Sequence, residues 1–172
     1  SPKYFLWITE LRQSLYEGDA VGATQKMEAG WPKLEESSML RINHYAWIAY
    51  GIRWCCYLAC AKQLPAQQKV WLKRADDCIR HLKRLQEPCF LCIAEAQTLV
   101  TEAAHGFVVD QTKWSAMVAK LYGKKLDLFA LALTWHQSLY APPSIAAAMQ
   151  QRVEQDFRDR GCVNPRKLMQ LI

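Results

Sequence analysis

Residues 16–19 have the sequence Tyr16-Glu17-Gly18-Asp19, which is typical of a boundary between two helices. Upstream of it, apolar residues recur at the spacing of an amphipathic helix. Gly18 can adopt the positive φ that ends a helix, and the Asp19 carboxylate can cap the helix that follows. We therefore predict helices over residues 4–17 and 20–29, joined by a very short turn and packed antiparallel.

The rest of the chain continues this pattern of helices separated by Gly, Pro and capping residues. We expect Gly30 and Pro32 to end the second helix, and Ser37 or Ser38, Asp110 and Ser144 to cap later ones. The further helices are predicted over residues 39–63, 66–86, 88–105, 111–122, 126–140 and 145–160, with a short one after Asn164-Pro165. No alternating strand pattern is found. The prediction is an all-α fold of about eight helices, arranged as helical hairpins or as a compact bundle.

Composition limits the class of protein. The chain has 172 residues, 51% of them hydrophobic, which suits one helical domain over residues 1–172. It begins with Ser1 and not Met, so we expect a fragment of a longer multidomain protein. Neither a membrane-spanning run nor a signal peptide is found. The seven cysteines lie in helical, apolar patterns, which favours a reducing, cytoplasmic compartment. The net charge of +6 permits acidic partners, but no nucleic-acid-binding motif is present.

Three helix boundaries carry a resemblance to a known family. They are Tyr16, Gly18 and Asp19, then Trp31 and Pro32 before Leu34, and finally Gly161, Asn164 and Pro165 before Leu168 and Met169. In this order they resemble the tetratricopeptide-like C-terminal helical domain of bacterial serine/threonine protein kinases and related multidomain signalling regulators. The segment 106–110 departs from the Gly-Asp turn of that family. The resemblance implies a regulatory module that binds a protein partner or an attached kinase domain, without catalysis or a cofactor of its own.

Aromatic residues and one arginine mark a candidate binding face on the helix predicted over residues 39–63. Trp47, Tyr50, Trp54 and Tyr57 recur at intervals of three and four, so they share one stripe. Arg53 lies beside them, in a stripe of small residues. Trp, Tyr and Arg are common at binding hot spots, so these five residues are the candidate partner-binding residues. Alternatively, the aromatic stripe belongs to the core, and Arg53 forms an internal ion pair with Glu95 or Glu102.

Three other readings stay open. A small ligand could bind among the helices at 39–63, 88–105 and 126–140, near Arg53 and Trp54. Cys89 and Cys92 form a C-x-x-C pair at a predicted helix start, where a thiol could be redox-active, or they pack as small apolar residues. No second pair completes a set of metal ligands, so no metal site is predicted. The basic residues of the helix at 66–86, among them Lys69, Lys73, Arg80 and Arg84 with His81 on the flank, could dock on phosphates but are interpreted as a solvated face.

Overall fold

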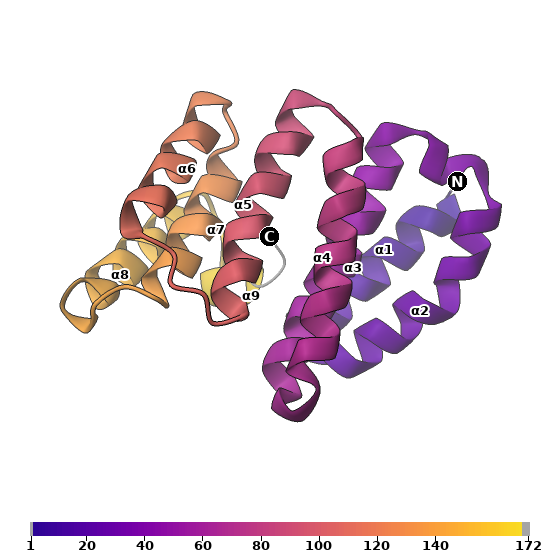
Figure 1. The fold of residues 1–172 in the computed structure, drawn as a ribbon, viewed down its shortest axis with the longest axis horizontal. Helices are drawn as coiled ribbons and strands as arrows, with labels where there is room; N and C mark the ends of the chain where they lie inside the picture. The colour runs from indigo at the N-terminus through magenta and orange to yellow at the C-terminus, as the bar shows by residue number, and fades with distance from the viewer. Residues whose placement is uncertain (1, 170–172) are drawn as a thin grey trace. The chain divides into compact units, whose positions relative to one another are not determined.

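The computed structural model describes residues 2–169, and in that part of the chain all regular structure is helical (Figure 1). This confirms the predicted all-α class. The α-helices are α1 (Pro2–Tyr16), α2 (Ala20–Glu36), α3 (Asn43–Gln63), α4 (Gln68–Arg84), α5 (Pro88–Ala104), α6 (Gln111–Gly123), α7 (Asp127–Ser138), α8 (Pro143–Asp159) and α9 (Pro165–Met169). Short 3-10 helices, η1 (Ser38–Arg41) and η2 (Pro65–Gln67), precede α3 and α4.

The chain forms two compact units, which meet in sequence between residues 86 and 87. The first unit contains α1 to α4, and in it α3 packs against α1, α2 and α4. The second contains α5 to α9, and in it α6 packs on α5 and α7, while α8 packs on α7 and α9. That residues 1–172 act as one domain stays a prediction.

The predicted turn between α1 and α2 is confirmed in detail. Gly18 has a φ of +87°, a conformation that residues with a Cβ rarely adopt. The Asp19 carboxylate accepts a hydrogen bond of 2.8 Å from the backbone N–H of Gly22, as an N-cap residue does. At the other end of the chain, Gly161 has a φ of +86°, and the Asn164 side chain accepts from the N–H of Lys167 at the start of α9.

The predicted end of α2 was wrong, because the helix continues through Gly30 and Pro32 to Glu36. Gly30 allows α2 to pack closely against α1, because a Cβ at this position would lie 2.6 Å from Nε1 of Trp7. Trp31 and Leu34 are buried on the core side of the same helix, while Pro32 is exposed. We attribute the continuation to this burial, which outweighs the one backbone hydrogen bond that Pro32 cannot donate.

Capping was predicted correctly at some helix starts and not at others. Asp110 caps α6 by accepting from the N–H of Thr112 at 2.8 Å. Ser37 accepts from the N–H of Met39 and so caps η1, whereas α3 begins only at Asn43. Ser144 does not cap α8, because Pro143 already occupies the first helical position, where its missing N–H costs nothing.

Each unit has its own buried residues. In the first unit Leu11, Met27, Trp54 and Leu82 are almost completely buried. In the second, one buried cluster contains Leu131, Val153, Phe157 and Met169. Within residues 2–169, no helix combines the length and the apolar character that crossing a membrane requires.

Candidate binding pocket

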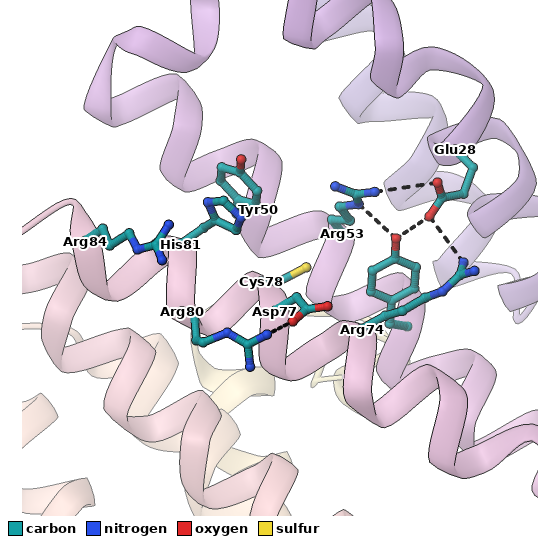
Figure 2. Close-up of a pocket in the computed structure, with 10 residues that line it drawn as sticks. Glu28, Tyr50, Arg53, Arg74, Asp77, Cys78, Arg80, His81 and Arg84 are labelled. Atoms are coloured by element: carbon teal, nitrogen blue, oxygen red, sulfur yellow. Dashed lines mark hydrogen bonds and ion pairs between the residues drawn. The ribbon is translucent and has the colours of Figure 1, made fainter.

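The first unit contains a pocket of about 550 Å³ whose lining residues come from α2, α3 and α4 (Figure 2). Helical spacing explains how these side chains meet, because residues three and four apart share a face. The lining residues are Glu28 from α2, then Tyr50, Arg53 and Tyr57 from α3, and from α4 Arg74, Asp77, Cys78, Arg80, His81 and Arg84.

At one end of the pocket, two arginines and a tyrosine surround the carboxylate of Glu28. Arg53 Nη2 lies 3.5 Å from one carboxylate oxygen, and Arg74 Nη1 lies 3.6 Å from the other. The Tyr57 hydroxyl donates a hydrogen bond to Glu28 and accepts one of 2.9 Å from Nε of Arg53. Figure 2 shows this group as a connected network. Burial and the nearby Glu28 carboxylate raise the pKa of Tyr57, so its hydroxyl stays protonated and remains a donor.

Aromatic rings fix the orientation of both arginines. The guanidinium carbon of Arg53 lies 3.8 Å from the ring centroid of Trp31, which is close enough for a cation–π interaction. The guanidinium carbon of Arg74 lies 5.0 Å from the ring centroid of Trp71, and that ring stacks on Tyr57. Two donors are therefore held in place before any ligand arrives, which lowers the entropy that binding would cost.

At the other end of the pocket, His81 stacks on Tyr50. The two ring centroids are 4.5 Å apart, and the ring planes differ by only 5°. His81 is an exposed residue, but partial desolvation of its imidazole lowers its pKa, and the positive charges of Arg84, Arg53 and Arg80 lower it further. Arg80 pairs with Asp77, which lies one turn earlier on α4. No ion pair involves Arg84 among residues 2–169.

The charges that line the pocket are unbalanced. Four guanidinium groups and two carboxylates give a net charge of +2 when His81 is neutral. Arginine presents several N–H donors in a planar fork that fits carboxylate and phosphate oxygens. The one thiol that lines the pocket, Cys78, has its pKa raised by burial to about 12, so it is not a ready nucleophile. The arrangement therefore suits the binding of an anion.

The structure brings together three of the five candidate binding residues. Tyr50, Arg53 and Tyr57 line the pocket. Trp54 is buried, with 2% of its surface exposed, and belongs to the core, so its assignment to a binding face was wrong. Trp47 is half-buried and does not line the pocket.

The predicted partners of Arg53 were also wrong. Its carboxylate partner is Glu28 from α2, and Glu95 instead pairs with Lys120. Sequence spacing could not identify Glu28, because the pairing depends on how α2 packs on α3. The alternative ligand site near Arg53 was expected among α3, α5 and α7, but the pocket at Arg53 takes no residue from α5 or α7.

Sequence reasoning ranked a binding role for α4 below that of a solvated face. Arg80 and Arg84 were interpreted as part of a solvated face, and Arg74 was not singled out, yet all three line the pocket. A signal was available, since Arg74, Asp77, His81 and Arg84 recur at intervals of three and four. Lys69 and Lys73 are exposed and lie outside the pocket, as expected for a solvated face.

The C-x-x-C pair lies in the second unit, at the start of α5. Cys89 is exposed and Cys92 is buried, and both thiols are free. Burial raises the pKa of Cys92, which disfavours its thiolate. A redox role for the pair stays a prediction. Within residues 2–169, no cluster of three or more His, Cys, Asp or Glu residues is placed to hold a metal ion.

Comparison of this chain with protein-family models, with curated proteins and with solved structures finds no match.

Proposed function

We propose that this chain is a non-catalytic interaction module that binds an acidic or phosphorylated segment of a partner protein. The pocket between α2, α3 and α4 is the proposed binding site. The observation that supports this proposal is the gathering of four arginines against two carboxylates in one hollow. Here the excess positive charge is concentrated where an incoming anion can displace water from several donors at once.

Aromatic groups in the pocket favour a peptide over an isolated ion. The stacked rings of Tyr50 and His81 offer apolar surface next to the charged donors, whereas the Tyr57 ring is itself buried. A peptide side chain or backbone can pack on such rings while its anionic group reaches the arginines. Tyrosine and arginine are enriched where proteins bind each other tightly.

The setting of the module is part of the proposal. We propose that it belongs to a bacterial signalling protein in the cytoplasm, where it recruits partners to a serine/threonine kinase domain or tunes that domain. The support is the resemblance of the helix boundaries around Gly18, Trp31 and Gly161. Sequencing the native polypeptide that carries this segment tests the point. A product that contains kinase motifs is expected, and a product near 19.8 kDa would contradict the attachment to a kinase.

A second candidate function is the sensing of a small anionic ligand. The pocket volume of 550 Å³ lies in the range of ordinary small-molecule sites and favours this candidate. A ligand that binds only the folded protein raises the melting temperature, and the rise grows with the logarithm of the ligand concentration relative to its dissociation constant. A panel of small organic acids and phosphates in a thermal-shift assay therefore tests it.

The protein-binding proposal is tested with two short labelled peptides and fluorescence anisotropy. One peptide carries several Glu residues, and the other carries Gln at the same positions. We expect the acidic peptide to bind about tenfold or more tightly than the neutral one, and more weakly as salt increases.

Paired charge changes on α4 separate pocket binding from general attraction to a basic protein. The double variant Arg80→Gln/Arg84→Gln removes two charges from the pocket, and Lys69→Gln/Lys73→Gln removes two from the solvated part of the same helix. We expect only the arginine variant to lose binding. An equal loss in both variants would contradict a specific site.

A further inference from the structure

We infer that the end of the pocket bounded by Arg53, His81 and Arg84 binds a phosphate monoester dianion, and that His81 takes up a proton when the dianion binds. This inference rests on the proposed function, because it names the chemical group that the same pocket recognises. The charge of the ligand, its shape and the uptake of a proton by His81 are each inferred from the side chains at that end of the pocket.

The positive charge is least compensated at the His81 end. Glu28 is engaged at the opposite end by Arg53 and Arg74, and Asp77 is engaged by Arg80. Arg84 has no such partner among the described residues. The charged and titratable groups that face His81 are Tyr50 and Arg53 from α3, Glu35 from α2, and Arg80 and Arg84 from its own helix. Two of these three guanidinium groups, those of Arg53 and Arg80, are paired with Glu28 and Asp77, so Arg84 carries the uncompensated charge at this end. The Glu35 carboxylate is engaged by the Trp31 indole, from which it accepts a hydrogen bond of 2.7 Å.

The donors at this end fit a phosphate better than a carboxylate. Arg53 uses Nε for Tyr57 and Nη2 for Glu28, which leaves Nη1 for a ligand. In Figure 2 the free side of the Arg53 guanidinium faces Tyr50 and His81, and the Arg84 guanidinium approaches His81 from the other side. Donors that reach a ligand from several directions match three phosphate oxygens, whereas a carboxylate offers two oxygens in one plane.

The imidazole of His81 supplies the coupling to protons. In the free protein, partial desolvation and the three arginines hold its pKa below the ordinary value of 6.5, so it is neutral near pH 7. A bound dianion would offset the field of the arginines and raise the pKa of His81. Linkage then requires the converse, so that protonation of His81 tightens the binding of the dianion.

Sulfate is the probe for this coupling, because it keeps two negative charges where a phosphate monoester changes its protonation. We would measure its dissociation constant from amide shifts in 1H–15N spectra between about pH 5.5 and 8. We expect binding to strengthen several-fold as pH falls. His81→Asn should bind weakly at every pH, whereas His44→Asn, a matched change at an exposed histidine of α3, should behave as the unmodified protein. Arg84→Lys keeps the positive charge but loses the planar set of N–H donors of the guanidinium. This variant should bind sulfate less tightly than the unmodified protein.

The inference fails if sulfate affinity is independent of pH, or if His81→Asn keeps the pH profile of the unmodified protein. It also fails if the sulfate-induced shifts lie away from α2, α3 and α4, which would indicate an adventitious ion only. A spectrum of each variant without sulfate shows whether it is folded.

Three ligands then separate this inference from the proposed function. They are a peptide with one phosphoserine, the same peptide with Glu in its place, and free phosphoserine. We expect the phosphopeptide to bind about tenfold more tightly than the Glu peptide. Equal affinity for the two peptides would overturn the phosphate inference and leave the protein-binding proposal standing. Binding of free phosphoserine with no added affinity from the peptide would support the phosphate site and overturn the protein-binding proposal.

Discussion

Arg53 shows how a single residue is prepared for binding by its neighbours. Its guanidinium rests on the Trp31 ring, its Nε is fixed by Tyr57, and one Nη faces Glu28. Only about a fifth of the side chain is exposed, so the group is held with little freedom. The distances to Glu28 exceed those of a tight charge-assisted hydrogen bond. We interpret Glu28 as a carboxylate that partly neutralises the positive charge of the pocket.

Removing the charge of Glu28 should therefore strengthen anion binding. The amide of Glu28→Gln can still accept from Tyr57, but it no longer competes for Arg53 and Arg74. We expect the sulfate affinity to rise several-fold by NMR titration. Glu36→Gln is the control, because this exposed residue ends the same helix and does not line the pocket. A drop in affinity for Glu28→Gln would mean that the carboxylate supports the site and does not oppose it.

The two cysteines of the C-x-x-C pair should differ sharply in reactivity. Cys89 is exposed, whereas Cys92 is buried and has its pKa raised by that burial. Because the thiolate is the reactive form, iodoacetamide should label Cys89 first and leave Cys92 protected in the folded protein. Peptide mapping by mass spectrometry measures both rates. Labelling of Cys92 as fast as Cys89 would show that the pair is more open than the structure indicates and would favour a redox role.

His81 should make stability depend on pH in a defined direction. Its pKa in the folded protein lies below the ordinary value of 6.5. Above 6.5 the imidazole is neutral in both states and has no effect. As pH falls through 6.5 and towards the folded pKa, the unfolded chain takes up the proton first, so the folded state loses stability.

The comparison that checks this effect is urea unfolding of the unmodified protein and of His81→Asn at several pH values. We expect the difference in unfolding free energy to shift in favour of the variant as the solution becomes more acidic. His44→Asn corrects for the loss of an exposed histidine. A difference that stays constant with pH would contradict the lowered pKa.

Among the elements, the turn between α1 and α2 was predictable because it depends on adjacent residues. Gly18 and Asp19 end one helix and begin the next, whatever the rest of the chain does. The end of α2 was not predictable in this way. Local rules place a break at Gly30 and Pro32, but the burial of Trp31 and the contact with Trp7 are tertiary effects.

The same distinction explains the binding site. Tyr50, Arg53 and Tyr57 share one side of α3, so sequence spacing could predict them as a group. Whether Trp54 faces the core or solvent depends on which helices cover α3, and here they cover Trp54. The pairing of Arg53 with Glu28 requires the packing of α2 on α3, which no motif encodes. The fold class could therefore be predicted from the sequence, whereas the residues of the pocket could be predicted only in part.

Replacing two glycines by alanine should change the stability of the protein in opposite directions. Gly18 has a positive φ and Gly51 lies inside α3, and in both cases an added Cβ would meet no atom within 4 Å. Any effect of alanine is thus conformational and not steric. We expect Gly18→Ala to lower the unfolding free energy by about 1 kcal/mol and Gly51→Ala to raise it by about 0.5–1 kcal/mol. Chemical denaturation measures both, and equal effects of the same sign would contradict the account.

At the scale of the whole molecule, the chain concentrates its proposed binding function in one of two compact units. The arginines that line the pocket all belong to the unit of α1 to α4. In the unit of α5 to α9, the basic side chains of Lys120, Arg158 and Arg166 pair with Glu95 or Glu154, whereas no ion pair is found for Lys124 or Lys125 among residues 2–169. An anionic partner should therefore recognise the first unit and leave the second largely unaffected.

The most direct test of the central claim is a 1H–15N spectrum of the full chain during titration with a short peptide that carries one phosphoserine. We predict that the largest shift changes fall on residues that line the pocket, among them Arg53, Cys78, His81 and Arg84, while those of α6 to α8 stay in place. Changes spread over basic residues of both units, or no changes at concentrations where an anion-binding pocket would be occupied, would contradict the claim.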